Sequence, residues 1–276
     1  YIQQNIEKAI YYFKLASDQD NANAQYNLGL LYYLQKDIKN AIHYFLLSSK
    51  QHPYSQNFLG VLYYDNKYIP RDINKSIYYF TMSANGNYPR AQHNLGPIYY
   101  QDKYIPRNIK KSLNYFNLAE KNNFHDSALK LGEIYYEGKY VEKDIEKAIH
   151  YFKEASSFNN EYAKNNLGII YKNGFENKVN KNLSLAKEYF EEAIRQKNDP
   201  LSMFNLANIY LDENKNDKAV DLLIKSINKG FVPPIVILYY LLSKNCDVVD
   251  VVSIENQLCK FNDDWKSFAP KLIDLY

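Results

Sequence analysis

A short pattern that recurs along the chain restricts the fold more than any other feature. A Leu-Gly pair occurs five times, with its glycines 31, 36, 36 and 36 residues apart, and a Leu-Ala pair follows 39 residues later. The pairs are Leu28-Gly29, Leu59-Gly60, Leu95-Gly96, Leu131-Gly132, Leu167-Gly168 and Leu206-Ala207. Self-similarity with a period of about 20–50 residues is typical of solenoids, in which each unit buries its apolar face against the next. We therefore predict a repeat array.

The residues around each glycine predict a first helix, which we call helix A. A small residue lies five positions before the glycine and a tyrosine lies three positions after it. Small residue, leucine, glycine and tyrosine thus share one helical stripe. Since glycine costs about 1 kcal/mol in a helix relative to alanine, its recurrence indicates that another helix approaches too closely for a Cβ atom.

A second helix, helix B, follows in each unit. It is expected to begin after a capping residue: Asn5, Asp37, Asp72, Asn108, Asp144 or Asn182. Its packed face carries a large apolar residue between two small ones: Phe13, Phe45, Phe80, Phe116, Phe152, Phe190 or Leu223. The glycine-to-phenylalanine distance is 20 residues in the three middle repeats and 16 in the first. We expect this four-residue insertion to form a loop that leaves both helical faces unchanged.

The repeat unit resembles the Sel1-like repeat, a relative of the tetratricopeptide repeat. Matching positions in the fourth full repeat are Gly132, Tyr135, Gly138, Val141, Asp144, Lys147, Ala148, Tyr151, Phe152 and Ala155. The resemblance implies an all-α fold, a right-handed α-solenoid superhelix of antiparallel helix pairs. It covers residues 1–230, as a leading helix B over 1–20 and repeats at about 21–52, 53–88, 89–124, 125–160, 161–199 and 200–230. Residues 231–276 leave the pattern and are predicted to form a helical C-terminal cap that contains Trp265.

Two local features depart from the regular repeat. The sequence begins inside a repeat, so residues 1–17 are expected to expose apolar surface, which makes the uncapped N-terminal helix a candidate association surface. Pro97 lies within the third full helix A and is predicted to kink it, because proline has no N–H and clashes with the carbonyl of His93.

Composition and motifs argue against several classes of protein. The net charge is only +3, with lysines interleaved among acids, which disfavours nucleic-acid binding. The sequence contains two cysteines without a CxxC motif, and none of the common nucleotide-binding, zinc-protease or hydrolase motifs. We therefore predict no catalytic, cofactor or metal site. The longest apolar run, Phe231 to Leu242, is shorter than the about 20 residues that span a bilayer, and a cytoplasmic location is expected.

Surface residues of helix A are the remaining candidates for function. In tetratricopeptide-like arrays helix A lines the concave face, and its exposed positions should be three before the glycine and one, four and five after it. The predicted protein-binding residues are Tyr26, Tyr33, Asn57, Tyr64, His93, Tyr100, Glu133, Tyr136, Asn165 and Lys172, and Val61, Pro97 and Leu129 occupy equivalent positions. Tyr33, Tyr64, Tyr100 and Tyr136 form a series that we call the tyrosine ladder. Its rings either bind an extended peptide or only cover the neighbouring repeat.

The favoured function is a non-catalytic scaffold or adaptor that binds a protein or extended peptide along the concave face; the resemblance implies roles in complex assembly, signalling or protein turnover. The alternative is an accessory array of a larger enzyme, such as a protein kinase whose catalytic domain lies outside this sequence. Tyr135 is expected to pack against Phe152, whereas the adjacent Tyr136 is expected to face the groove.

Overall fold

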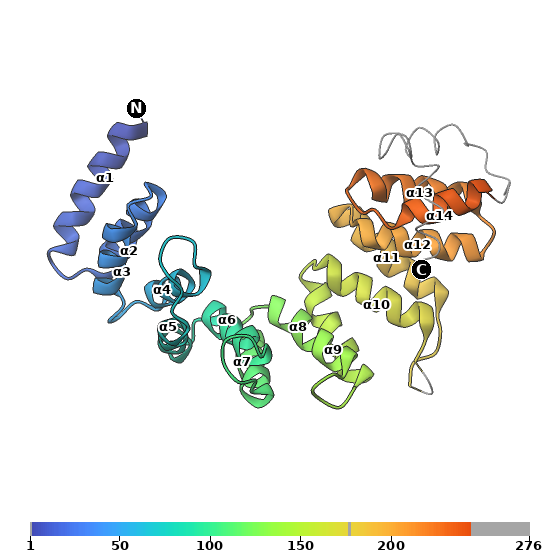
Figure 1. Cartoon of the computed structure of the whole chain (residues 1–276), viewed down its shortest axis with the longest axis horizontal. Coiled ribbons are helices and arrows are strands. Elements are labelled where there is room, and N and C mark those ends of the chain that lie inside the picture. Colours follow the sequence, from blue (N-terminus) through green and yellow to red (C-terminus); the bar gives the residue numbers. More distant parts are fainter. Residues whose placement is uncertain (1, 176–177, 244–276) are drawn as a thin grey trace. The chain divides into compact units, whose positions relative to one another are not determined.

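The computed structural model describes residues 2–175 and 178–243, and fourteen α-helices lie in this part of the chain (Figure 1). They are α1 (Ile2–Ser17), α2 (Ala22–Leu34), α3 (Ile38–Ser48), α4 (Pro53–Asp65), α5 (Ile73–Asn85), α6 (Pro89–Tyr100), α7 (Ile109–Lys121), α8 (Asp126–Glu137), α9 (Ile145–Ser157), α10 (Glu161–Asn173), α11 (Leu183–Lys197), α12 (Pro200–Asp212), α13 (Asn216–Asn228) and α14 (Pro234–Ser243). Even-numbered helices up to α12 are helices A, and α1 and the odd-numbered helices are helices B.

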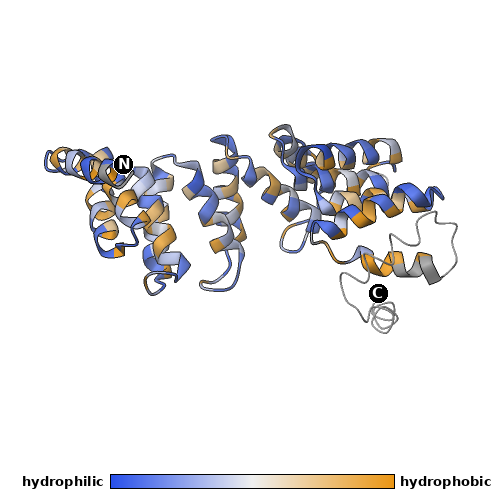
Figure 2. Ribbon diagram, turned by 90° about the horizontal axis from the view of Figure 1, so that it is seen from above, coloured by the Kyte–Doolittle hydropathy of each residue, from blue (hydrophilic) through white to orange (hydrophobic). Residues whose placement is uncertain are grey.

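The chain divides into two compact units. The first contains Tyr1–Ile134 and Gly138–Glu142, and so holds α1, three complete helix pairs and most of α8. The second contains Tyr135–Glu137 and Lys143–Tyr276, and holds α9 to α14. Hydrophobic and hydrophilic residues occupy different sides of most helices in both units (Figure 2). The predicted all-α architecture of antiparallel helix pairs is confirmed.

The predicted capping residues set the start of helix B in five repeats. Each side-chain oxygen accepts a hydrogen bond of 2.9–3.1 Å from the backbone N–H three residues later, and the caps are Asp37, Asp72, Asn108, Asp144 and Asn182. The backbone N–H bond holds the pKa of Asp37, Asp72 and Asp144 below the usual aspartate value. The prediction for Asn5 is wrong, because α1 already begins at Ile2 and Asn5 lies inside it.

The expected close approach at the glycines is made by the phenylalanine ring of helix B. A Cβ atom added to Gly29, Gly60, Gly96 or Gly168 would lie only 2.4–2.6 Å from the ring of Phe45, Phe80, Phe116 or Phe190. Each of these rings is at most 2% exposed. In two repeats a serine of helix B also donates a hydrogen bond to the glycine carbonyl, from Ser76 to Gly60 at 2.8 Å and from Ser112 to Gly96 at 2.9 Å.

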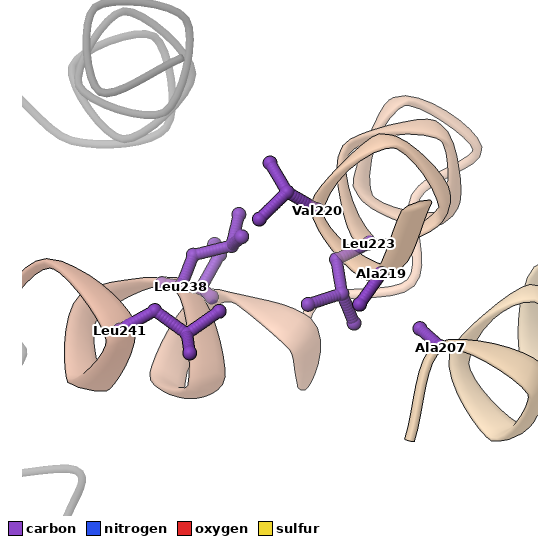
Figure 3. Close-up of a cluster of buried hydrophobic side chains, with 7 residues drawn as sticks. Ala207, Ala219, Val220, Leu223, Leu238 and Leu241 are labelled. Carbon is purple, nitrogen blue, oxygen red and sulfur yellow. The ribbon is translucent and has the colours of Figure 1, made fainter. Parts of the chain in front are cut away.

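The last repeat shows the same contact with a different pair of residues. Ala207 replaces the glycine and Leu223 replaces the phenylalanine, and both are fully buried in one cluster with Ala219 and Val220 (Figure 3). The alanine methyl group is therefore accommodated where the opposing side chain is smaller. Leu238 and Leu241 of α14 complete this cluster, so α14 covers the apolar side of the last helix pair. The remaining cap residues, including Trp265, lie outside the described residues.

The two irregular features have different outcomes. Tyr11, Tyr12 and Leu15 of α1 are 59%, 66% and 46% exposed, so the expected apolar surface on the N-terminal helix is confirmed. Helix α6 continues through Pro97 without interruption, and the expected kink stays a prediction.

Candidate functional site

Loops from the following repeat cover the tyrosine ladder in the first unit. Tyr33 meets Tyr68 edge-to-face at a ring-centroid distance of 5.4 Å, Tyr64 meets Tyr104 at 5.9 Å, and Tyr100 meets Tyr140 at 5.4 Å. Tyr68, Tyr104 and Tyr140 all come from the long loops between helix A and helix B. The expectation that this insertion leaves both faces unchanged is therefore wrong, because its tyrosine lies against the ladder residue of the preceding repeat.

Two of these loops also contain an arginine that stabilises the contact between repeats. The Nε atom of Arg71 donates to the Tyr64 carbonyl at 2.6 Å, and its guanidinium group lies 4.9 Å from the Tyr104 ring centroid. Arg107 repeats the arrangement, with 2.8 Å to the Tyr100 carbonyl and 3.9 Å to the Tyr140 ring. Guanidinium groups stack favourably on aromatic faces. In the first unit, the ladder tyrosines thus make packing contacts between successive repeats and also form a half-exposed surface.

The first tyrosine of each pair has a separate partner on helix B. Five stacked pairs have ring centroids 5.5–5.9 Å apart and planes within 13° of parallel: Tyr32–Tyr44, Tyr63–Tyr79, Tyr99–Tyr115, Tyr135–Tyr151 and Tyr171–Tyr189. Tyr135 therefore packs on helix B as expected, but its partner is Tyr151. The Phe152 ring lies 6.4 Å from the ring of Tyr136. The prediction that Phe152 packs against Tyr135, and that Tyr136 only faces the groove, is therefore corrected.

The position three residues before the glycine mainly contacts the next helix A. Asn165 is only 1% exposed, and its Oδ1 accepts hydrogen bonds from Ser202 Oγ at 3.3 Å and Asn205 Nδ2 at 2.8 Å. Leu129 is also buried, at 8% exposure. The predicted exposure of both residues on the concave face is wrong; Asn165 is buried because α12, the next helix A, packs over it.

Four residues from the predicted surface positions do converge on one pocket in the first unit, the α4–α6 pocket. Its volume is about 230 Å³, and it is lined by Val61, Tyr64, Phe80, His93, Asn94, Pro97 and Ile98. Val61, Tyr64, His93 and Pro97 were selected from the repeat register alone. A fifth, Asn57, reaches the site because its Oδ1 accepts a 3.0 Å hydrogen bond from Asn94 Nδ2.

His93 is held in the pocket wall by aromatic rings and one hydrogen bond. Its ring centroid lies 4.9 Å from Phe124 and 5.6 Å from Phe116, and its Nδ1 lies 2.8 Å from Ser127 Oγ. Burial lowers the pKa of His93 to about 4, so the imidazole is neutral at pH 7. None of the lining residues then carries a formal charge.

Three lining residues, Phe80, Asn94 and Ile98, are not among the predicted surface positions. A signal was present for Asn94, since asparagine occupies the position two residues before the glycine or Ala207 in four repeats: Asn27, Asn94, Asn166 and Asn205. Asn205 makes the same type of bond to the preceding repeat as Asn94 does. Phe80 gave no separate signal because its main role is packing against Gly60.

The other predicted residues do not line this pocket. Tyr26 packs on His52 at a ring-centroid distance of 4.7 Å, and Glu133 accepts a 2.7 Å hydrogen bond from Lys130 Nζ. Tyr136 lies under the Lys143 ammonium group at 5.3 Å, and Lys172 is half-buried in the last turn of α10.

Two other kinds of feature are absent from the described part of the chain. Residues 2–175 and 178–243 contain no cluster of three histidine, cysteine, aspartate or glutamate side chains that could hold a metal ion. Within the same ranges, no helix has both the length and the apolar character required to cross a bilayer.

Paired helices, a glycine–aromatic contact repeated along the chain, and a surface pocket between successive helices A together define an array of the tetratricopeptide-like class. The Sel1 repeat profile matches residues 53–88, 89–124, 125–157, 161–198 and 200–231, more than half of the chain, and a tetratricopeptide repeat profile matches residues 3–57. The chain belongs to the Sel1 repeat family. Proteins of this family are generally scaffolds for protein interactions.

Solved structures with the same fold include two bacterial Sel1-type proteins. The protective antigen c5321 of uropathogenic Escherichia coli, described as displaying an SLR fold, is similar with a TM-score of 0.83 and 21% identity over 95% of this chain. This chain spans 56% of that protein. A Sel1 repeat protein from Oxalobacter formigenes is similar with a TM-score of 0.76 and 22% identity over 99% of this chain and 81% of its own. No curated protein matches the sequence.

Proposed function

We propose that this chain is a non-catalytic scaffold that binds a protein partner through the helix A surface of its second and third full repeats, at the α4–α6 pocket. The observation that carries the proposal is the convergence of Val61, Tyr64, His93 and Pro97 on one concavity. These residues come from two successive helices A, so the pocket exists only because the repeats stack.

The chemistry of the pocket supports a protein ligand. Val61, Pro97 and Ile98 offer apolar surface, while Asn94 and His93 offer hydrogen-bonding groups at the same place. Val61 is 36% exposed, so this apolar surface is accessible. Tyrosine supplies a large contact area at a low cost in conformational entropy, and Tyr64 is already held by Arg71 and Tyr104. Little ordering of the site is then needed on binding.

The test is a selection of peptides from a random display library on the folded chain, followed by affinity measurements on two variants. Val61→Arg places a long charged side chain at the pocket, and the selected peptides should lose most of their affinity. Tyr78→Ala alters a residue of α5 that is 58% exposed and does not line the pocket, and should bind normally. Failure to select any peptide, or equal binding by the Val61→Arg variant, contradicts the proposal.

The enzyme-associated alternative assigns the same task to these residues, because the repeats would still recruit a partner. It differs only in what else the parent polypeptide carries.

A further inference from the structure

The last repeat lacks the aromatic stack that the preceding repeats share. The residue just before the central apolar residue of helix B is a tyrosine in the six preceding helices B, but it is Leu222 in α13. In five repeats this tyrosine stacks on the tyrosine of helix A, as Tyr189 stacks on Tyr171 at a ring-centroid distance of 5.8 Å. Tyr210 is the helix A tyrosine of the last repeat. A smaller side chain without a ring therefore occupies the position of its stacking partner.

A pocket lies at this position in the second unit, and we call it the α11–α13 pocket. Its volume is about 460 Å³, within the range of about 300–1,000 Å³ that is usual for small-molecule sites. Tyr210 and Leu222 both line it and are half-buried, while Leu206 in its wall is only 3% exposed. The other lining residues are Glu191, Ile194, Arg195, Lys218 and Asp221. The pocket thus combines apolar walls with a partly accessible phenol ring.

The charges that line the pocket leave an excess of positive groups. Arg195 and Lys218 are opposed by Glu191 and Asp221. Asp221 accepts a 2.7 Å bond from the Nζ atom of Lys225, so its charge is already balanced by a residue outside the lining. Neither Arg195 nor Lys218 makes an ion pair within residues 2–175 and 178–243. Two unpaired cations therefore face one remaining carboxylate.

Three ammonium groups also surround the Tyr210 ring. The Nζ atoms of Lys187, Lys215 and Lys218 lie 5.6, 5.9 and 5.8 Å from its centroid. Glu213 pairs with both Lys187 and Lys215, so one carboxylate is shared between two cations. A negative group on a ring placed beside Tyr210 would be attracted here, and a positive group would be repelled.

The preceding repeats show which group fits beside the helix A tyrosine. Five of them place a phenol ring there, with centroids 5.5–5.9 Å apart and planes within 13° of parallel. We propose that the α11–α13 pocket binds a small, free aromatic acid, whose ring stacks on Tyr210 and whose carboxylate lies near Lys218 and Arg195. This pocket shares no lining residue with the α4–α6 pocket, so the inference does not depend on the proposed function.

The probe is 4-hydroxyphenylacetate, titrated against the whole folded chain and followed by ligand-observed NMR. Cyclohexylacetate keeps the carboxylate without an aromatic ring, and tyramine keeps the phenol ring with an ammonium group. The uncharged N-acetyltyrosinamide represents a tyrosine side chain of a protein. We expect 4-hydroxyphenylacetate to bind about two- to tenfold more tightly than cyclohexylacetate, the range that aromatic stacking contributes beyond buried area. Tyramine and N-acetyltyrosinamide should bind more weakly because they lack the negative charge.

Leu222→Tyr is the decisive variant. It introduces the side chain that the six preceding helices B carry, so the fold should accept it, and its ring would fill the ligand's position. Binding should be lost while stability in urea stays the same or rises. Lys218→Gln should weaken binding about two- to fivefold, as expected for one exposed charge pair. Lys111→Gln is the matched control and should change nothing, because Lys111 lies 5.1 Å from the ring of Tyr99, which Tyr115 already stacks on.

Three results would overturn this assignment. They are an absence of 4-hydroxyphenylacetate binding, unchanged affinity in Leu222→Tyr, and equal affinity for 4-hydroxyphenylacetate and tyramine. Equal binding of N-acetyltyrosinamide would overturn it as well, because the site would then recognise a neutral aromatic side chain rather than an acid. If Leu222→Tyr does not fold, Lys218→Gln and Lys111→Gln decide the matter, and equal affinity in these two variants rejects the site.

Discussion

Gly60→Ala tests the central packing contact of the repeat. The added Cβ would lie 2.5 Å from Cδ1 of Phe80, whereas carbon atoms pack favourably at about 3.5–4.0 Å. Phe80 is only 2% exposed. Overpacking of this kind costs about 1–3 kcal/mol, and the better helix propensity of alanine returns about 1 kcal/mol. We expect the helix pair α4–α5 to lose up to about 2 kcal/mol, the difference between these two effects.

The last repeat indicates how this loss can be reversed. There Ala207 faces a cluster that contains Leu223, and the methyl group is accommodated. Combining Gly60→Ala with Phe80→Leu reproduces that pair in the second repeat. The double variant should be more stable than the sum of the two single changes predicts, with a coupling energy of about 1 kcal/mol or more.

Native-state hydrogen exchange is the appropriate assay, because long repeat arrays do not always unfold in one step and exchange reports the opening free energy of individual helices. The amides of α4 and α5 should lose protection in Gly60→Ala, and those of α12 and α13 should change little. A stabilising Gly60→Ala, or two additive single changes, would refute the argument that the ring position dictates glycine.

Three other perturbations address other contacts. Arg107→Lys keeps the positive charge but removes the planar guanidinium group that lies 3.9 Å from the Tyr140 ring centroid. The loop amides around residues 101–108 should then exchange severalfold faster. Unchanged exchange would show that the arginine does not hold the loop. Because burial lowers the pKa of His93 from 6.5 to about 4, the unfolded state binds more protons between these values. The stabilising effect of the neutral imidazole is therefore present above pH 6.5 and lost as the pH falls towards 4. His93→Gln should remove that part of the pH dependence in urea melts, and equal slopes in both proteins would argue against it. Finally, the amides of α1 should exchange faster than those of α5 in a monomeric sample, since Tyr11 and Tyr12 remain exposed; equal protection would mean that another surface covers this helix.

Contacts within a repeat could be predicted from the sequence because they depend only on local periodicity. A glycine and a phenylalanine at fixed positions in two antiparallel helices must meet, and they do at Gly60 and Phe80. Capping residues such as Asn108 could be predicted equally well, because the capping hydrogen bond spans only three residues. The position of α14 on the last pair followed from its apolar sequence and its proline start.

Contacts between repeats were not predictable in the same way. They depend on the offset between successive helix pairs, which no single repeat encodes. Asn165 therefore looked exposed although the next helix A buries it. The loop residue Tyr104 looked like a connector although it lies on Tyr64 of the preceding repeat. The candidate pocket could be predicted only in part for the same reason. Its exposed helix A positions followed from the repeat register, but the position of Asn94 depends on its bond to Asn57 of the preceding repeat.

Pro97 is the position where the local sequence rule is broken, and its location gives the departure a physical meaning. Elsewhere in helix A the repeats use residues compatible with a helix, and the one other unfavourable residue, glycine, is explained by a ring such as Phe116 opposite Gly96. Proline at position 97 relieves no comparable crowding that the described contacts reveal, yet it leaves α6 continuous. A residue that costs stability without a packing return is expected at functional sites. Pro97 lies in the wall of the α4–α6 pocket, so its local cost falls at the site where we propose that a protein partner binds.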